Sequence, residues 1–398
     1  KYRGVRARTA FPCSSKLPKG DRMDKKIYNI VAINPGSTST KFGFYHNCEK
    51  IFIENIYHKK DELSQFGSIQ EQLSYRKLLV ENRCACNGVN LQDVDAFVGR
   101  GGGLLPSTSG VYCINDKIIY DCETAASGIH HPALLASQIA RQLANKYDAK
   151  AYIVNPPDTD EFQDLARVTG IKGIYRDSHV HCLNQKEVAR RYCLEKGIAY
   201  NESNFIICHL GGGVSITAHR KGRMIDSNDN LIGDGPMTPL RAGTIPAKKI
   251  IDMAFSGDYT HEELEDLIVR NSGLSCHLGT ADVQEIMRRI EEDNDEYAKL
   301  VLDAMIYQFA KAVGECACVL KGDVDAILIT GGLARSEYIV RSLEKYVDWI
   351  SETWVMPGEW EIAALASGAY QAMTDQVDVL TYTGVPVFRG FHSLKYHL

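Results

Sequence analysis

Three apolar strands in this chain each end in a turn that contains glycine. These strand–turn units span Ile27–Tyr45, Asn204–Arg220 and Ile327–Arg335. Glycine lets the backbone approach a phosphate closely, and consecutive N–H groups in such a turn form a concavity that binds anions. The side chains that could add hydroxyl or ammonium donors are Ser37, Ser39, Lys41 and Ser215. The repeated pattern therefore predicts a protein that holds a polyphosphate.

Length and composition narrow the class of protein. A chain of 398 residues is too long for one ordinary core, so we expect two domains. The net charge is −5, and without a basic stripe this argues against nucleic acid as a partner. No apolar run approaches the roughly 18 residues that a membrane span needs. The 12 cysteines include no CxxC pair, which favours reduced thiols in a cytoplasmic protein.

The start of the chain differs in composition from the rest. Residues 1–22 carry seven Lys or Arg and the single acid Asp21, with no apolar period. Met23 then leads into the first strand. We expect residues 1–26 to be a disordered extension, and an organelle transit peptide is the alternative because such peptides are basic and poor in acids.

Beyond this extension, strands alternate with helices, which is typical of α/β proteins. The expected strands, besides the two hairpins, are Lys50–Tyr57, Asp95–Gly99, Ala151–Val154 and Val324–Thr330. The expected helices are Ser68–Cys84, Gly128–Lys146, Asn184–Lys196, Glu262–Val269, Ala281–Ile290, Glu296–Leu320 and Trp360–Met373. Because each half of the chain begins with a hairpin, we expect a duplicated domain around a cleft.

The turns and several segments between them match a known family. The segments are Asn34–Lys41 (NPGSTSTK), Val180–Arg190 (VHCLNQKEVAR), His209–Ser215 (HLGGGVS), Ala218–Asp226 (AHRKGRMID), Gly233–Pro246, Gly331–Ala334 (GGLA) and Tyr382–Pro386 (YTGVP). The three glycine turns look like the phosphate-1, phosphate-2 and adenosine motifs of the acetate and sugar kinase, Hsp70 and actin superfamily. In order and spacing, the whole set resembles the acetokinase family, and within it the butyrate kinases, over residues 27–388.

This resemblance implies a fold and an activity. The fold is two duplicated ribonuclease-H-like (actin-like ATPase) domains around a central nucleotide cleft. Residues 27–157 and 358–398 would form the domain that binds the acyl and phosphate groups, and residues 158–357 the nucleotide-binding domain. The activity is reversible transfer of the ATP γ-phosphoryl group to butyrate, giving butyryl phosphate and ADP, with Mg²⁺, in a homo-oligomer.

The acceptor explains which residue types the site needs. An alkyl carboxyl group has an ordinary pKa of about 4.3 and is already an anion at neutral pH, so no general base is required. The difficulty is to hold two anions in line, and arginine suits this because its planar fork binds carboxylate and phosphate. By resemblance, Arg100 and Arg241 are those arginines, and His181 donates to the transferring group. His130 matches a second cleft histidine, although its neighbour His131 leaves open which of the two faces inward.

The resemblance also assigns nucleotide contacts. Those of the first turn are Asn34, Ser37, Ser39 and Lys41. Those of the second are His209, Gly211, Gly212 and Gly213, where His209 is as well suited to a structural hydrogen bond as to a ligand contact. Those of the third are Gly331, Gly332 and Leu333, which would pack against the adenosine.

Magnesium ligands are expected at Asn34, Asn155 and Glu359, with Glu361 as the alternative to Glu359. The family usually has an aspartate where this chain has Asn155, and the amide keeps an oxygen but loses the charge. Asp158 or Asp160 could compensate. The departure keeps open a second interpretation, a nucleotide-binding regulator with little turnover.

Substrate size has one indication, again by resemblance. Gly102 and Val180 match positions near the acyl group that carry larger residues in acetate kinases. Each methylene buried in the extra space contributes about 0.8 kcal/mol, which favours butyrate over acetate, with propionate or a branched-chain acid as the alternative. A dinucleotide-binding oxidoreductase is disfavoured, since no GxGxxG follows a first strand and opens a helix.

Overall fold

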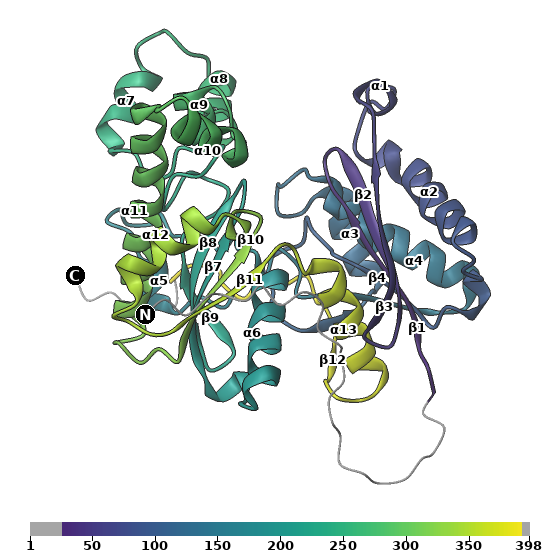
Figure 1. Ribbon diagram of the computed structural model, residues 1–398. Coiled ribbons are helices and arrows are strands. Elements are labelled where there is room, and N and C mark those ends of the chain that lie inside the picture. Colours follow the sequence, from purple (N-terminus) through teal and green to yellow (C-terminus); the bar gives the residue numbers. More distant parts are fainter. Residues whose placement is uncertain (1–25, 392–398) are drawn as a thin grey trace.

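The computed structural model describes residues 26–391, which form two α/β lobes, each built on one sheet (Figure 1). The expected extension therefore lies outside the described residues, except for Lys26. The strands of the first sheet are β1 (Asn29–Pro35), β2 (Ser39–His46), β3 (Glu49–Tyr57), β4 (Ala96–Gly99), β5 (Val111–Cys113), β6 (Lys150–Val154) and β12 (Val379–Leu380). Those of the second sheet are β7 (Asn204–Leu210), β8 (Val214–Arg220), β9 (Arg223–Ser227), β10 (Ala326–Gly331) and β11 (Thr353–Pro357).

The two sheets repeat one topology. The first contains the order β3-β2-β1-β4-β6, and the second has the order β9-β8-β7-β10-β11. In each sheet the first three strands form an antiparallel meander, and the next two join parallel to its first strand. The duplication expected from the two hairpins is therefore confirmed, and β5 and β12 extend only the first sheet.

Helices of each lobe cover one face of its sheet, and one of two further helices, described below, covers the other. On the first lobe these are α1 (Lys60–Leu63), α2 (Leu73–Cys86), α3 (Asp116–Thr124) and α4 (Leu135–Tyr147). On the second lobe they are α5 (Asp164–Arg167), α7 (Ala247–Ala254), α8 (His261–Val269), α9 (Gly273–Leu278), α10 (Val283–Glu292), α11 (Glu296–Val319) and α12 (Glu337–Val347). Leu302, Met305 and Phe309 of α11 are fully buried in the core of this lobe, which explains the strong helical periodicity of that segment.

Two helices lie between the lobes, one packed on each sheet. Helix α6 (Cys182–Lys196) follows the last long strand of the first sheet, yet packs on β7 and β10 of the second. Helix α13 (Glu361–Met373) follows β11 of the second sheet, yet packs on β1, β4 and β6 of the first. The approach of α13 is close, because a Cβ at Gly368 would lie 2.6 Å from Val154 Cγ1. Because α6 and α13 also contact each other, they tie the lobes together (Figure 1).

Local sequence accounts for several element ends. The side chain of Asp295 accepts a hydrogen bond from the backbone N–H of Ala298 and so starts α11. Gly197 adopts a left-handed conformation that ends α6. The helix expected from Gly128 begins only at Leu135, because Pro132 opens a separate short 3-10 turn before it.

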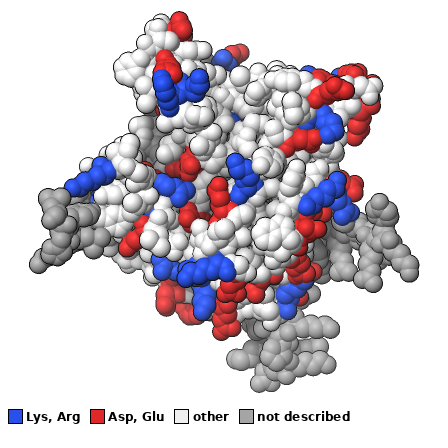
Figure 2. All heavy atoms as spheres, turned by 90° about the vertical axis from the view of Figure 1, so that its left-hand side faces the viewer, with Lys and Arg blue, Asp and Glu red and all other residues white. Residues whose placement is uncertain are grey.

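No helix in the described part of the chain is long and apolar enough to cross a membrane. On the face of the second lobe shown in Figure 2, Lys and Arg are interspersed with Asp and Glu.

Candidate active site

The amino ends of α6 and α13 meet at the boundary between the lobes. His181 occupies the N-cap position of α6, and Glu361 is the first residue of α13. A hydrogen bond of 2.7 Å from the backbone N–H of Trp360 to Asn184 Oδ1 joins the two helix starts. Helix amino ends carry partial positive charge, so their convergence favours an anion at this place.

The first glycine turn joins β1 to β2 and is held from behind by an arginine. Arg76 of α2 is fully buried, and its Nη1 donates to the carbonyl oxygens of Gly36 and Ser39 and to Thr40 Oγ1, each at 3.0 Å. Burial lowers the pKa of Arg76 to about 10, so the side chain stays charged at neutral pH. Arg76 therefore fixes the turn and adds positive charge beneath it.

Beside this turn, an asparagine, a glutamate and an arginine form one contact group. Asn34 Nδ2 donates to Glu361 Oε2 at 2.7 Å, and Arg100 Nη2 lies 3.2 Å from Glu361 Oε1. The structure thus brings together two residues that the sequence singled out separately, Asn34 and Arg100, around Glu361 rather than Glu359. Glu359 is exposed and lies 3.5 Å from Lys41 Nζ.

The second glycine turn, Gly211–Gly213, joins β7 to β8 and touches the second predicted arginine. A Cβ at Gly213 would overlap Nη1 of Arg241 and Oδ1 of Asn230. Arg241 Nη1 donates to Asn230 Oδ1 at 2.5 Å, and burial lowers the pKa of Arg241. The hydroxyl of Thr238 donates to the carbonyl oxygen of Gly212 and accepts from the backbone N–H of Arg241. The arginine is therefore attached directly to the turn.

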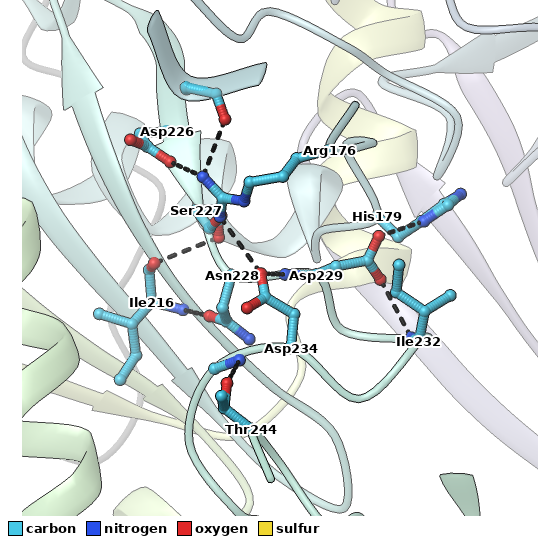
Figure 3. A network of polar contacts seen from close by, with 12 residues as sticks. Arg176, His179, Ile216, Asp226, Ser227, Asn228, Asp229, Ile232, Asp234 and Thr244 are labelled. Atoms are coloured by element: carbon cyan, nitrogen blue, oxygen red, sulfur yellow. Dashed lines mark hydrogen bonds and ion pairs between the residues drawn. The ribbon is translucent and has the colours of Figure 1, made fainter. Parts of the chain in front are cut away.

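A half-buried polar network centred on Arg176 (Figure 3) holds the chain that leads to the loop of Arg241. Arg176 bonds Asp226 at 2.9 Å and Asp234 at 3.2 Å, and Asp234 also accepts from the backbone N–H of Asp229. Asp229 lies 2.6 Å from His179 Nδ1. Burial alone would lower the pKa of His179, but the hydrogen bond and charge of Asp229 outweigh it, so the pKa is raised.

His181 and His209 stack directly on each other, with ring centroids 3.8 Å apart and an interplanar angle of 11°. Burial lowers the pKa of His209 to about 4. The pKa of His181 falls well below its usual value because of burial, with further contributions from His209, Arg100 and Arg241. Both imidazoles are therefore neutral at physiological pH.

The third turn follows β10 and lies against the second. Gly331 has a φ of +91°, and a Cβ there would clash with the backbone of Leu210. Gly331 and Gly358 exchange two backbone hydrogen bonds, which place the turn beside the start of α13. By contrast, a Cβ at Gly332 would meet nothing within 4 Å, so this residue leaves an open surface next to Leu333.

The residues predicted for the acyl site differ in how deeply they are buried. His130 is exposed, whereas His131 accepts from the backbone N–H of Ala133 through Nδ1 and lies 3.5 Å from Ser37 through Nε2. Burial, followed by the charges of Arg100 and Arg76, lowers the pKa of His131 to about 4. Gly102 is buried, and a Cβ there would lie 3.2 Å from Ala133. Val180 packs with Cys182 and Met224 in a small core cluster.

The remaining predicted metal positions are partly engaged by protein groups. Asn155 has a φ of +41°, and its Oδ1 accepts from the backbone N–H of Gly110 at 2.9 Å. Asp160 forms a buried two-bond ion pair with Arg167, each bond 2.7 Å long. Asp158 is buried with one carboxylate oxygen unpaired, and burial raises its pKa to about 6. Residues 26–391 contain no group of three His, Cys, Asp or Glu that could hold a metal.

Three residues that hold the site were not singled out from the sequence. Arg76 lies in a polar helix with no motif of its own. Asn184 and Gln185 lie inside the matched segment Val180–Arg190, which pointed to their neighbourhood but to no role. Their contacts are with residues distant in the chain, such as Thr330, which is 3.3 Å from Asn184.

The fold and site define a two-domain α/β protein of the actin-like ATPase class, with three glycine turns, two arginines and a stacked histidine pair. Solved structures with this fold include acetate kinases from Porphyromonas gingivalis and Entamoeba histolytica. The first has a TM-score of 0.71 and 17% identity and covers 88% of this chain and 100% of its own. The second has a TM-score of 0.68 and 17% identity and covers 85% and 98%.

The chain belongs to the acetokinase family. A match to that family spans residues 165–347. A probable butyrate kinase of Bacteroides thetaiotaomicron is 44% identical over 354 residues, which are 89% of this chain and 99% of the relative. One from Clostridium botulinum is 39% identical over 355 residues, with the same shares. The family and fold expected from the sequence are therefore confirmed.

Proposed function

We propose that this protein is a carboxylate kinase that transfers the γ-phosphoryl group of ATP reversibly to butyrate, giving butyryl phosphate and ADP. The observation that carries the proposal is that each lobe supplies one arginine to the site. Arg100 lies 3.2 Å from Glu361 at the start of α13, Arg241 closes over Gly213 in the second glycine turn, and the charges of both lower the pKa of His181. Two cations and a neutral hydrogen-bond donor suit a reaction in which two anions must meet. The family membership and the names of the two relatives support the same choice.

In this proposal, catalysis is positioning and charge neutralisation. A carboxylate oxygen forms a bond to the γ-phosphorus while the bond from that phosphorus to the β,γ-bridging oxygen breaks, and ADP leaves with the electron pair. Arg100 and Arg241 neutralise the charge that spreads over the transferring group. The backbone of Gly211–Gly213 would hold the nucleotide phosphates, and the open surface at Gly332 and Leu333 would receive the adenosine.

The residues at the first turn fit Mg²⁺. Asn34 Oδ1 is buried without a hydrogen-bond partner among the described residues, and its neighbour Glu361 is a carboxylate. Such hard oxygen donors, together with substrate phosphates, are what Mg²⁺ takes in kinases. When bound, Mg²⁺ would neutralise phosphate charge. We propose Asn34 and Glu361 as its nearest protein ligands, with Glu359 and Asn155 further out.

The acyl group would lie near Gly102 and His131. We propose His131 rather than His130 for the substrate contact, because His131 faces Ser37 and Arg100. The names of the relatives favour butyrate, and propionate or a branched-chain acid is the alternative. One observation favours a different function, a nucleotide-binding regulator with little turnover: Asn155 replaces an acid, and its amide oxygen is already bonded to Gly110.

We further propose that the domains divide at residues 27–157 plus 358–398 and 158–357, and that the protein works as a cytoplasmic homo-oligomer. The division is supported by the strand membership of the two sheets.

The decisive experiment is an acyl-phosphate assay with hydroxylamine, using ATP, Mg²⁺ and straight and branched acids from two to six carbons. We expect the highest kcat/KM with butyrate. A maximum at propionate or a branched acid would select the alternative substrate. Tight ATP binding without acyl phosphate from any acid would select the regulator.

A further inference from the structure

The hydrogen bonds around the stacked histidines determine where each imidazole carries its proton. A neutral imidazole donates from one ring nitrogen and accepts at the other, and the partner at one nitrogen decides the arrangement. The Nδ1 atoms of His181 and His209 each form a hydrogen bond with a protein group, and the other contacts of that group show whether it donates or accepts.

At His209 the deciding residue is Asn184. Asn184 Oδ1 accepts from the backbone N–H of Trp360, which can only donate, so the amide nitrogen must point the other way. That nitrogen lies 2.9 Å from His209 Nδ1 and donates to it. His209 Nδ1 is therefore an acceptor and its proton is on Nε2, which lies at the second glycine turn, 3.5 Å from where a Cβ of Gly211 would be.

At His181 the deciding residues are Gln185 and Ser215. Gln185 Nε2 donates to the carbonyl oxygen of Ser215, which can only accept, and also lies 2.9 Å from Ser215 Oγ. Ser215 Oγ thus accepts from Gln185 and, at 3.3 Å, from the backbone N–H of His181. Its single proton remains for His181 Nδ1, 2.8 Å away. The proton of His181 is therefore also on Nε2.

The chain of hydrogen bonds continues from Gln185 through His219 and ends at Tyr200. Gln185 Oε1 lies 2.9 Å from Nε2 of His219, which must donate, and Tyr200 then donates to His219 Nδ1 at 2.7 Å. His219 is fully buried, so this network is shielded from water that could reverse it. Asn184 and Gln185 are consecutive residues in the first turn of α6, so one helix sets both imidazoles.

We propose that Asn184 and, through Ser215, Gln185 are positioning residues that hold His209 and His181 as neutral imidazoles protonated on Nε2, so that the stacked pair offers two N–H donors to the transferring phosphoryl group. This inference rests on the proposed function for the identity of the anion. The tautomers themselves do not depend on it.

The absence of charge on the two imidazoles matters as much as the position of their protons. Charged groups facing the pair are Arg100 and Arg241 from the two lobes and Glu359 near the start of α13. Two imidazolium rings at 3.8 Å between two arginines would repel each other, whereas two neutral rings donate without this cost. We therefore expect neither His181 nor His209 to ionise between about pH 6 and 8.

The direct test is ¹⁵N NMR of the full chain labelled in histidine, with His181→Gln and His209→Gln variants to assign the two rings. We expect both rings at pH 7.5 to show a protonated Nε2 and an unprotonated Nδ1. A proton on Nδ1 of either ring, or a doubly protonated ring, would overturn the proposal. This outcome needs no turnover, so it is distinguishable from failure of the proposed kinase activity.

The kinetic test is Asn184→Asp. The carboxylate can still accept from Trp360, but its other oxygen can only accept from His209 Nδ1, which draws a proton there. We expect kcat to fall about 10²-fold at pH 8, the effect of losing one preorganised donor, and to recover partly at lower pH as His209 becomes doubly protonated. The matched control is Asn115→Asp, because Asn115 likewise accepts from a backbone N–H and donates its amide, at the start of α3. A flat pH profile in Asn184→Asp, with Nε2 of His209 still protonated, would overturn the proposal.

Discussion

The guanidinium of Arg241 occupies the space that a side chain at Gly213 would need. Gly213 has an ordinary φ, so the turn does not need glycine for its backbone conformation there. It needs glycine because Arg241 and Asn230 close over its α-carbon. The second glycine turn therefore positions an arginine, in addition to its proposed role in binding phosphate.

This contact predicts that Gly213→Ala acts through Arg241. We expect Arg241→Ala to lower kcat by about 10²-fold or more with the fold intact, because it removes a cation that neutralises the transition state. Gly213→Ala should approach that loss, and the double variant should be no worse than Arg241→Ala alone, since both changes remove the same group. Gly314→Ala on α11, where a Cβ meets nothing within 4 Å, is the control. Additive losses in steady-state kinetics would contradict the coupling.

The second prediction separates Glu361 from Glu359. Glu361 is buried between Asn34 and Arg100, whereas Glu359 is exposed beside Lys41. We expect Glu361→Gln to lower kcat by about 10²-fold and to raise the magnesium concentration needed for half-maximal rate, because a buried charge next to Arg100 is lost. Glu359→Gln should change kcat by less than about tenfold. Initial rates over a magnesium titration measure kcat and the half-saturating magnesium concentration of each variant. A larger effect of Glu359→Gln than of Glu361→Gln would assign the metal position to Glu359.

A third prediction concerns the two adjacent histidines. Replacing His131 by Asn should raise the KM for the carboxylate by about tenfold, the loss of one hydrogen bond to an anion. His130→Asn should leave KM within about twofold, because that side chain is exposed. Each variant serves as the other's control. Equal effects in the same assay would show that the half-buried position of His131 is unrelated to substrate binding.

The buried histidines predict acid sensitivity. His58 has a pKa lowered to about 4, by burial and then by the charge of Arg76, while its value in the unfolded chain is about 6.5. The unfolded state therefore binds more protons below pH 6.5, and stability falls as the pH drops from about 6.5 towards 4. We expect His58→Gln to reduce the loss of Tm between pH 7.5 and 5 by a few degrees. His261→Gln, on the exposed surface of α8, should leave that loss unchanged. Calorimetry at pH 7.5 and 5 measures this loss of Tm. An equal loss in His58→Gln and His261→Gln would contradict a role of His58 in acid sensitivity.

The sequence predicted the parts of the fold whose signal is local. An apolar run followed by glycine identifies β1, β7 and β10, and unbroken periodicity identifies α11. The strands β5 and β12, at one end of the first sheet, have three and two residues, too few for any pattern to be visible. The site shows the same limit. His181 and Arg241 lie in matched segments, and Arg100 directly follows a short apolar strand. Asn184 acts through His209 and Trp360, which are 25 and 176 residues away, so no local spacing could reveal its role.

The last prediction is that Asn155→Asp raises activity at limiting magnesium. Asn155 follows β6 at a strand end, where ligands bind in open α/β sheets. Its two acidic neighbours are poor substitutes, because Asp160 is paired with Arg167 and Asp158 is buried with a raised pKa. An aspartate at 155 could keep the bond from Gly110 with one oxygen and present the other as a charged ligand, which Mg²⁺ or its bound waters prefer to an amide.

The benefit should disappear at saturating magnesium, because occupancy then no longer limits the rate. The measurement is a magnesium titration of initial rate for both forms at fixed ATP, with a several-fold lower half-saturating concentration expected in Asn155→Asp. Asn115→Asp again provides the matched control, since it adds a carboxylate at the N-cap of α3. The competing physical effect is repulsion between the new carboxylate and the ATP phosphates. If repulsion dominates, the half-saturating concentration will stay the same or rise, and Asn155 will not be a weakened metal position.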